Sequence, residues 1–172
     1  DTAKHLTADG GDFYAINPKG QVPLIELDDG TRLSEGPVIA QYIADRADAR
    51  ALMPPAGSLA RYRVMEWQNY ITSEIHKSFT PLFHSDVDAT AKKALAAVLR
   101  KKLVWLDGQL TGKSHLTGET FTAADAYLFT VLGWAKFVQI DLADLKNVVA
   151  FMARVAARPA VQAAMKAEGL IA

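Results

Sequence analysis

The pattern of apolar and polar residues changes along the chain, and this change separates a short first part from a longer second part. In the first part, Val22 to Leu27 favours a strand, Asp28-Asp29-Gly30 is a hairpin turn signal, and Thr31 to Ser34 returns as a second strand. Ser34 is then positioned to cap a helix that packs on the hairpin. The apolar face of this helix comprises Val38, Ile39, Tyr42 and Ile43.

The second part has helical periodicity throughout. Ser58 is expected to cap a long helix with one apolar stripe. This stripe comprises Val64, Trp67, Ile71, Ile75 and Phe79. At about 100° per residue, Asn69, Ser73 and His76 fall on the opposite face. Lys77 lies beside them, so this polar face is a candidate ligand site.

Later segments continue the helical pattern. Leucines from Leu95 to Leu110 form the stripe of another amphipathic helix. Thr122-Ala-Ala-Asp125 has the form of a capping box, and it starts an apolar segment, Ala123 to Ile140, that we interpret as a buried helix. We assign Thr122 and Asp125 a structural role only.

A proline-containing segment, Ala47 to Gly57, separates the two parts. We place the domain boundary there, which gives a first domain over residues 1–47 and an all-α domain over residues 58–172. The expected fold class is therefore α/β followed by all-α.

Composition narrows the possible functions. The 172 residues include no cysteine, which excludes a disulfide, a thiolate metal site and a cysteine nucleophile within the sequence shown. Lys plus Arg and Asp plus Glu number 19 each without a long block of one charge, so neither a nucleic-acid groove nor a membrane-binding patch is indicated. No histidine has metal-ligand spacing, and no metal site is expected. We expect a cytoplasmic protein with a small-molecule or protein partner.

The stretch from Asn17 to Gly36 carries the strongest chemical signal. An X-Pro bond such as Val22–Pro23 adopts the cis form at a cost of only about 0.5 to 1 kcal/mol, and this form would turn the Val22 backbone toward an extended peptide-like ligand. Glu35 and Gly36 open a helix, where free N–H groups favour an anion, and the Glu35 carboxylate suits an ammonium group. Together these groups fit a small zwitterionic peptide.

Each candidate also has an ordinary structural interpretation. Val-Pro occurs in plain edge strands, and Glu35 complements a helix dipole. His76 and Lys77 are compatible with a solvated helix face. The aromatic residues Phe79, Phe83 and Trp134 are core candidates first, although an apolar pocket would use the same residue types.

These motifs together resemble the glutathione S-transferases, most closely the bacterial beta class, over essentially the whole chain. The matching features are Asn17-Pro-Lys-Gly-Gln-Val-Pro23, Asp28-Asp29-Gly30, Glu35-Gly36, Tyr62 to Lys77, Phe121 to Leu128, Arg158-Pro159 and Ala167 to Leu170. The resemblance implies a thioredoxin-like first domain, an all-α second domain and a homodimer that binds glutathione as co-substrate.

The resemblance also implies roles for individual residues. Val22 and Pro23 would bind the cysteinyl part of glutathione, and Glu35 and Gly36 its γ-glutamyl end. Asn69, Ser73 and Glu74 would approach the site from the partner subunit. His76 and Lys77 would lie near the sulfur or the glycyl end, where positive charge favours the thiolate. Phe79, Phe83 and Trp134 would lie toward the pocket for an apolar electrophile.

Family members of this type have a first strand, a first helix and a second strand ahead of the region shown. That segment carries the residue next to the sulfur, which is a cysteine in this class. The resemblance therefore implies a truncated thioredoxin-like domain, and we expect the chain to belong to a longer polypeptide.

Three functions are compatible with these observations. The first is conjugation of the glutathione thiolate to small apolar electrophiles. The second is glutathione-dependent disulfide exchange or peroxide reduction, which requires the cysteine. The third is a protein of the same fold that binds glutathione or another protein without catalysis.

Overall fold

The computed structural model describes Asp1 and residues 3–171, which form two compact units with a boundary between Ala49 and Arg50. The boundary lies within the proline-containing segment. The residues from Arg50 onward belong to the second unit because they pack with it: Met53 is buried, and the Ala123 N–H donates to the Leu52 carbonyl at 3.0 Å.

The first unit contains the predicted hairpin. A short 3-10 helix, η1 (Phe13–Ala15), precedes strands β1 (Leu24–Glu26) and β2 (Arg32–Ser34). The strands are antiparallel, with Ile25 opposite Leu33, and Gly30 provides the positive φ of +80° that the turn requires. These are the two strands of a single sheet within the described residues.

Helix α1 (Gly36–Arg46) follows the hairpin and packs on both strands. The prediction that Ser34 caps it is wrong, because Ser34 ends β2 and its hydroxyl contacts the Lys19 ammonium at 3.1 Å. The cap position is Glu35, with φ of +73°. Two strands cover only part of the predicted apolar face, so Ile39 is buried whereas Val38 and Ile43 are exposed.

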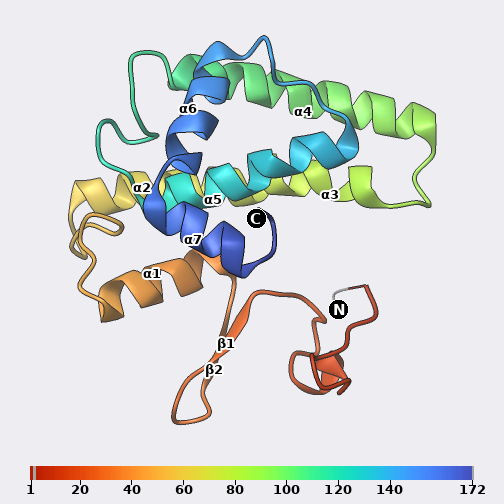
Figure 1. The fold of residues 1–172 in the computed structure, drawn as a ribbon, viewed down its shortest axis with the longest axis vertical. Coiled ribbons are helices and arrows are strands. Elements are labelled where there is room, and N and C mark those ends of the chain that lie inside the picture. The colour runs from red at the N-terminus through yellow and green to blue at the C-terminus, as the bar shows by residue number, and fades with distance from the viewer. Residues whose placement is uncertain (2, 172) are drawn as a thin grey trace. The chain divides into compact units, whose positions relative to one another are not determined.

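The second unit is helical (Figure 1). Ser58 caps α2 (Leu59–Tyr70) as predicted, since its hydroxyl accepts from the Arg61 N–H at 3.2 Å. The chain continues without interruption into a π-helix, η2 (Ile71–His76), and then α3 (Lys77–Phe83). Helix α4 (Ala89–Gln109) returns alongside α3. The leucine stripe is correct, with Leu99, Leu103 and Leu106 fully buried.

The capping box is confirmed at the start of α5 (Ala123–Leu132). The helix does not continue to Ile140, because the chain tightens at Gly133 into the 3-10 helix η3 (Gly133–Val138). Helices α6 (Lys146–Ala156) and α7 (Pro159–Ala167) complete the unit. Among the described residues, no single helix is long and apolar enough to cross a membrane; α6 and α7, bent by 78°, meet that test only as a pair, on length and composition.

Candidate functional site

In the first unit, the backbone of Val22 is available for pairing. The Val22–Pro23 peptide bond is cis, and the Val22 side chain is 59% exposed. Within the part of the chain that the structure describes, neither the N–H nor the C=O of Val22 has a hydrogen-bond partner. Because β1 begins two residues later, an extended ligand has a donor and an acceptor to pair with at this point.

Glu35 and Gly36 lie at the same end of the hairpin. A Cβ atom placed on Gly36 would lie 3.6 Å from Pro23 Cγ, so the start of α1 and Pro23 are neighbours. The Glu35 carboxylate pairs with the Lys19 ammonium at 2.7 Å, and both side chains are at least half exposed. Glu35 therefore already holds one ammonium group in solvent, which is the kind of contact that was predicted for a ligand.

In the second unit, three predicted residues, His76, Phe79 and Phe83, surround a fourth, Trp134. The His76 ring lies edge-on to the Trp134 ring with centroids 4.6 Å apart. Phe79 and Phe83 meet Trp134 at 6.0 and 6.1 Å, also nearly perpendicular. Phe79 is fully buried and supports Trp134 from the core, whereas Phe83 is 50% exposed. Phe83 and Trp134 are therefore the better candidates for contact with a substrate.

The position of His76 differs from the predicted one. At about 100° per residue, an α-helix would place His76 opposite the apolar stripe. In the structure His76 is half-buried, and its Nδ1 lies 2.7 Å from the Tyr127 hydroxyl of α5. The reason is η2, whose wider turns rotate the residues after Ile71 relative to an α-helix. Such π-helical segments are frequent at functional sites.

Burial and the nearby Lys77 charge hold the pKa of His76 below its ordinary value of 6.5. His76 is therefore neutral near pH 7, and the prediction that its positive charge favours a thiolate does not fit this environment. Lys77, which is exposed, remains the candidate cation at this point.

The lowered pKa has a consequence for stability. The unfolded chain takes up a proton on His76 at a higher pH than the folded protein does, so the free energy of unfolding falls as the pH drops from above 6.5 through the lowered pKa. Below that pKa, His76 is protonated in both the folded and the unfolded chain, and the free energy of unfolding falls no further on this account. We expect the stability difference between the wild type and His76→Gln to shrink across this window. Urea unfolding at a series of pH values measures this stability difference. A difference that does not change with pH would contradict the prediction.

The remaining predicted polar residues share one helical surface. Asn69, Ser73 and Lys77 are exposed, and the Ser73 hydroxyl donates to the Asn69 carbonyl at 3.1 Å. Glu74 forms an ion pair within the unit: the Lys102 ammonium of α4 lies 2.9 Å from its carboxylate and lowers its pKa. Sequence reasoning missed Lys102, since the sequence contains no local signal for a contact between residues 28 positions apart.

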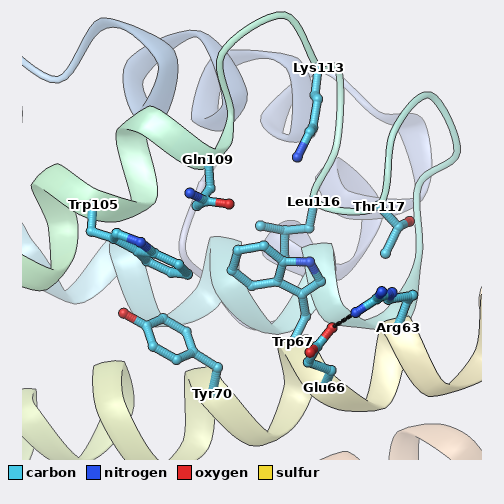
Figure 2. A pocket seen from close by; sticks show the side chains of 9 residues that line it. All are labelled: Arg63, Glu66, Trp67, Tyr70, Trp105, Gln109, Lys113, Leu116 and Thr117. Carbon is cyan, nitrogen blue, oxygen red and sulfur yellow. Dashed lines mark hydrogen bonds and ion pairs between the residues drawn. The ribbon is translucent and has the colours of Figure 1, made fainter.

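A hollow of about 550 Å³ also lies in the second unit, between α2, α4 and the loop after α4 (Figure 2). Its aromatic wall is formed by Trp67, Tyr70 and Trp105, with ring centroids 4.8 to 6.0 Å apart. Burial, with a contribution from Glu74, raises the pKa of Tyr70. The sequence pattern had assigned Trp67 to the core stripe and contained no sign of this hollow.

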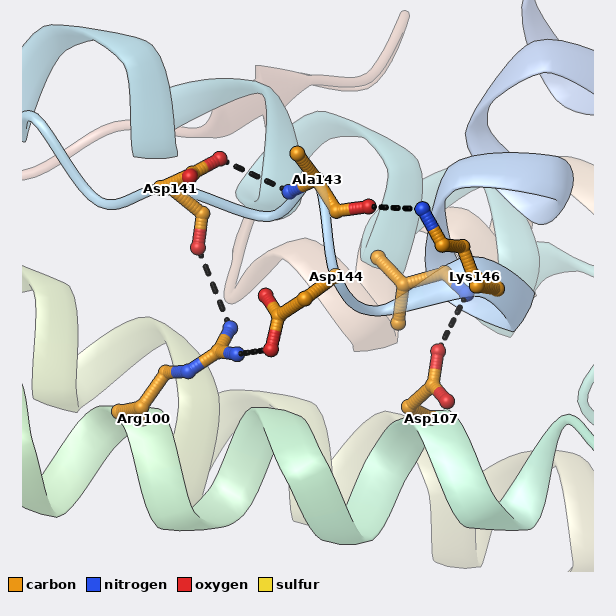
Figure 3. A network of polar contacts seen from close by, with 7 residues as sticks. Arg100, Asp107, Asp141, Ala143, Asp144 and Lys146 are labelled. Carbon is orange, nitrogen blue, oxygen red and sulfur yellow. Dashed lines mark hydrogen bonds and ion pairs between the residues drawn. The ribbon is translucent and has the colours of Figure 1, made fainter.

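A polar network joins α4 to the segment before α6 (Figure 3). Arg100 pairs with Asp144 and donates to the Asp141 carbonyl at 3.1 Å, and Asp107 accepts from the Val148 N–H at 2.9 Å. These contacts position the start of α6, and we assign them a structural role. No group of three or more potential metal ligands exists among the described residues.

Two family models match this chain, one in each of its two parts. A family model described as glutathione S-transferase, N-terminal domain, matches residues 3–46, and one described as glutathione S-transferase, C-terminal domain, matches residues 70–159. Glutathione S-transferase GstA of Escherichia coli O157:H7 is 49% identical over 170 residues, which cover 99% of this chain and 85% of the relative. The chain belongs to the glutathione S-transferase family.

Solved structures of the family agree with this assignment. A sphingomonad glutathione S-transferase complexed with glutathione has a TM-score of 0.93 and 44% identity, and the match covers 99% of this chain and 85% of that one. A bacterial beta-class glutathione S-transferase of Sphingomonas chungbukensis has a TM-score of 0.95 and 43% identity with the same coverage. The resemblance to this class and the expected fold, a thioredoxin-like domain followed by a helical domain, are therefore confirmed.

Proposed function

We propose that this glutathione S-transferase binds glutathione at the Val22–Gly36 end of its first unit and conjugates the thiolate to small apolar electrophiles. The observation that carries the proposal is the Val22 backbone, whose N–H and C=O are without partners beside Pro23 and the start of α1. Its relatives of high identity are glutathione S-transferases, and one of the similar structures holds glutathione.

Each part of glutathione has a matching group. The cysteinyl amide pairs with the Val22 backbone as one more strand would. The γ-glutamyl carboxylate receives the Gly36 N–H at the start of α1, where the helix dipole favours an anion. The γ-glutamyl ammonium replaces Lys19 as the partner of the Glu35 carboxylate.

In the second unit, His76 and Lys77 face the sulfur or the glycyl end. Lys77 contributes positive charge and His76 a neutral hydrogen bond, both of which favour the thiolate over the thiol. Trp134 and Phe83, supported by Phe79, form the pocket for the electrophile.

We further propose a homodimer in which Asn69, Ser73 and Glu74 reach the glutathione bound by the partner subunit. Large apolar side chains are exposed on the two helices next to these residues, which is the kind of surface that an assembly buries. They are Tyr62 and Met65 on α2 and Val98 and Trp105 on α4.

The reaction of a chlorinated dinitrobenzene tests the activity. The thiolate sulfur forms a bond to the ring carbon, the carbon–chlorine bond breaks, and chloride leaves while the thiol proton passes to the solvent. We expect conjugate to form at a rate that saturates in both substrates and that S-methylglutathione inhibits in competition with glutathione. If glutathione binds but the rate stays at the uncatalysed level, the protein is a binding protein without this activity. If glutathione does not bind, the proposed site is wrong.

A further inference from the structure

Tyr127 and His76 form a hydrogen-bonded pair that links two elements of the second unit. The Tyr127 hydroxyl of α5 lies 2.7 Å from Nδ1 of His76 at the end of η2, and 51 positions separate the two residues in the sequence. The Trp134 ring lies against the same imidazole at 84°, so both the plane of the ring and one of its nitrogens are fixed.

The chemistry of the two groups sets the direction of this hydrogen bond. A neutral imidazole has one nitrogen that accepts and one that donates, whereas a phenol keeps its proton up to about pH 10. The imidazole nitrogen is a much stronger base than the phenol oxygen, so the favoured arrangement has the Tyr127 O–H donating to Nδ1. The remaining proton of a neutral His76 is then on Nε2.

We propose that Tyr127 is a positioning residue that holds His76 in the tautomer protonated on Nε2, so that the Nε2–H is presented to the sulfur of glutathione. This inference rests on the proposed function, because it assigns the sulfur as the group that receives the hydrogen bond. A donor fixed in place stabilises the thiolate without reorganisation during the reaction. A histidine that alternates between tautomers offers this donor for only part of the time.

The tautomer itself is measurable without any activity. Nitrogen NMR of protein labelled with ¹⁵N-histidine distinguishes the protonated ring nitrogen from the bare one, and His76→Gln assigns the His76 signals among the four histidines of the chain. We expect the Nε2–H form in the wild type and a mixture of both forms in Tyr127→Phe. A wild-type His76 protonated on Nδ1 would overturn the inference whatever the enzyme does.

Kinetics test the link to catalysis. Loss of one hydrogen bond to the positioned group is expected to lower kcat of Tyr127→Phe about tenfold and to change KM for glutathione less than about twofold. In a His76→Gln background, Tyr127→Phe should cause no further loss of kcat, because the proposed effect on the sulfur passes through His76. Equal losses in both backgrounds would mean that Tyr127 supports only the fold, and this result would overturn the inference.

Thr130→Val is the matched control, since it removes an exposed hydroxyl of the same helix, which donates to the Ala126 carbonyl at 3.0 Å, and kcat is expected to stay unchanged. The two proposals fail in different ways. A wild type without glutathione-dependent turnover contradicts the proposed function, whereas the NMR result decides the tautomer separately.

Discussion

Replacing Asp125 by alanine is expected to destabilise the helical unit by about 3 to 5 kcal/mol, because three hydrogen-bond donors lose their partner inside the core. Asp125 is fully buried. Its carboxylate accepts from the Leu116 N–H at 2.8 Å, the Thr122 N–H at 2.8 Å and the Thr122 hydroxyl at 2.7 Å. The residue therefore joins the loop after α4 to the start of α5 as well as capping the helix.

Asp88→Ala is the matched control. Asp88 caps α4 through two backbone N–H groups, of Thr90 and Ala91, but it is exposed, so its loss is expected to cost only about 1 kcal/mol. Urea unfolding, monitored by tryptophan fluorescence, measures the free energy of unfolding of both variants. The three tryptophans, Trp67, Trp105 and Trp134, all lie in the second unit. Equal losses for Asp125→Ala and Asp88→Ala would show that the buried carboxylate has no special role.

Replacing Glu35 by glutamine is expected to weaken glutathione binding by about 1.5 to 3 kcal/mol, or roughly 10- to 150-fold in Kd. The substitution keeps the size of the side chain and removes the charge that holds Lys19 at 2.7 Å and, in the proposed complex, the γ-glutamyl ammonium. In the proposed complex the ligand would shield this contact from water, so its loss is expected to exceed that of an exposed ion pair.

The control for Glu35→Gln lies on the same hairpin. Glu26 forms an exposed ion pair of the same kind with Arg32, at 2.8 Å, and it is not part of the proposed site. Glu26→Gln is therefore expected to leave the Kd for glutathione within about twofold of the wild type. Equal weakening by both substitutions would indicate a general effect of charge and not a contact at Glu35.

Local patterns in the sequence predicted the elements that depend on neighbouring residues. The hairpin turn at Gly30, the cap at Ser58 and the box formed by Thr122 and Asp125 each involve residues at most a few positions apart. The predicted Ser34 cap failed because the tertiary path places Ser34 at the end of β2 and turns the chain at Glu35.

Features that depend on distant residues could not be predicted in this way. The π-helical turns of η2 rotate His76 toward Tyr127, and no residue of Ile71–His76 is specific for that geometry. The contact between Lys102 and Glu74 and the hollow beside Trp67 likewise arise from packing between α4 and the preceding helices. Local sequence therefore indicated that Val22, Pro23 and Gly36 come together at one end of the hairpin, but not the surroundings of His76 and Glu74.

The central claim is that the end of the hairpin recognises a γ-glutamyl peptide. Calorimetric titration with glutathione and with cysteinylglycine, which lacks the γ-glutamyl group, tests it most directly. We predict that the wild type binds glutathione at least about tenfold more tightly than cysteinylglycine, and that Glu35→Gln loses most of this preference. Equal affinity of the wild type for the two peptides, or a preference that Glu35→Gln retains in full, would contradict the claim.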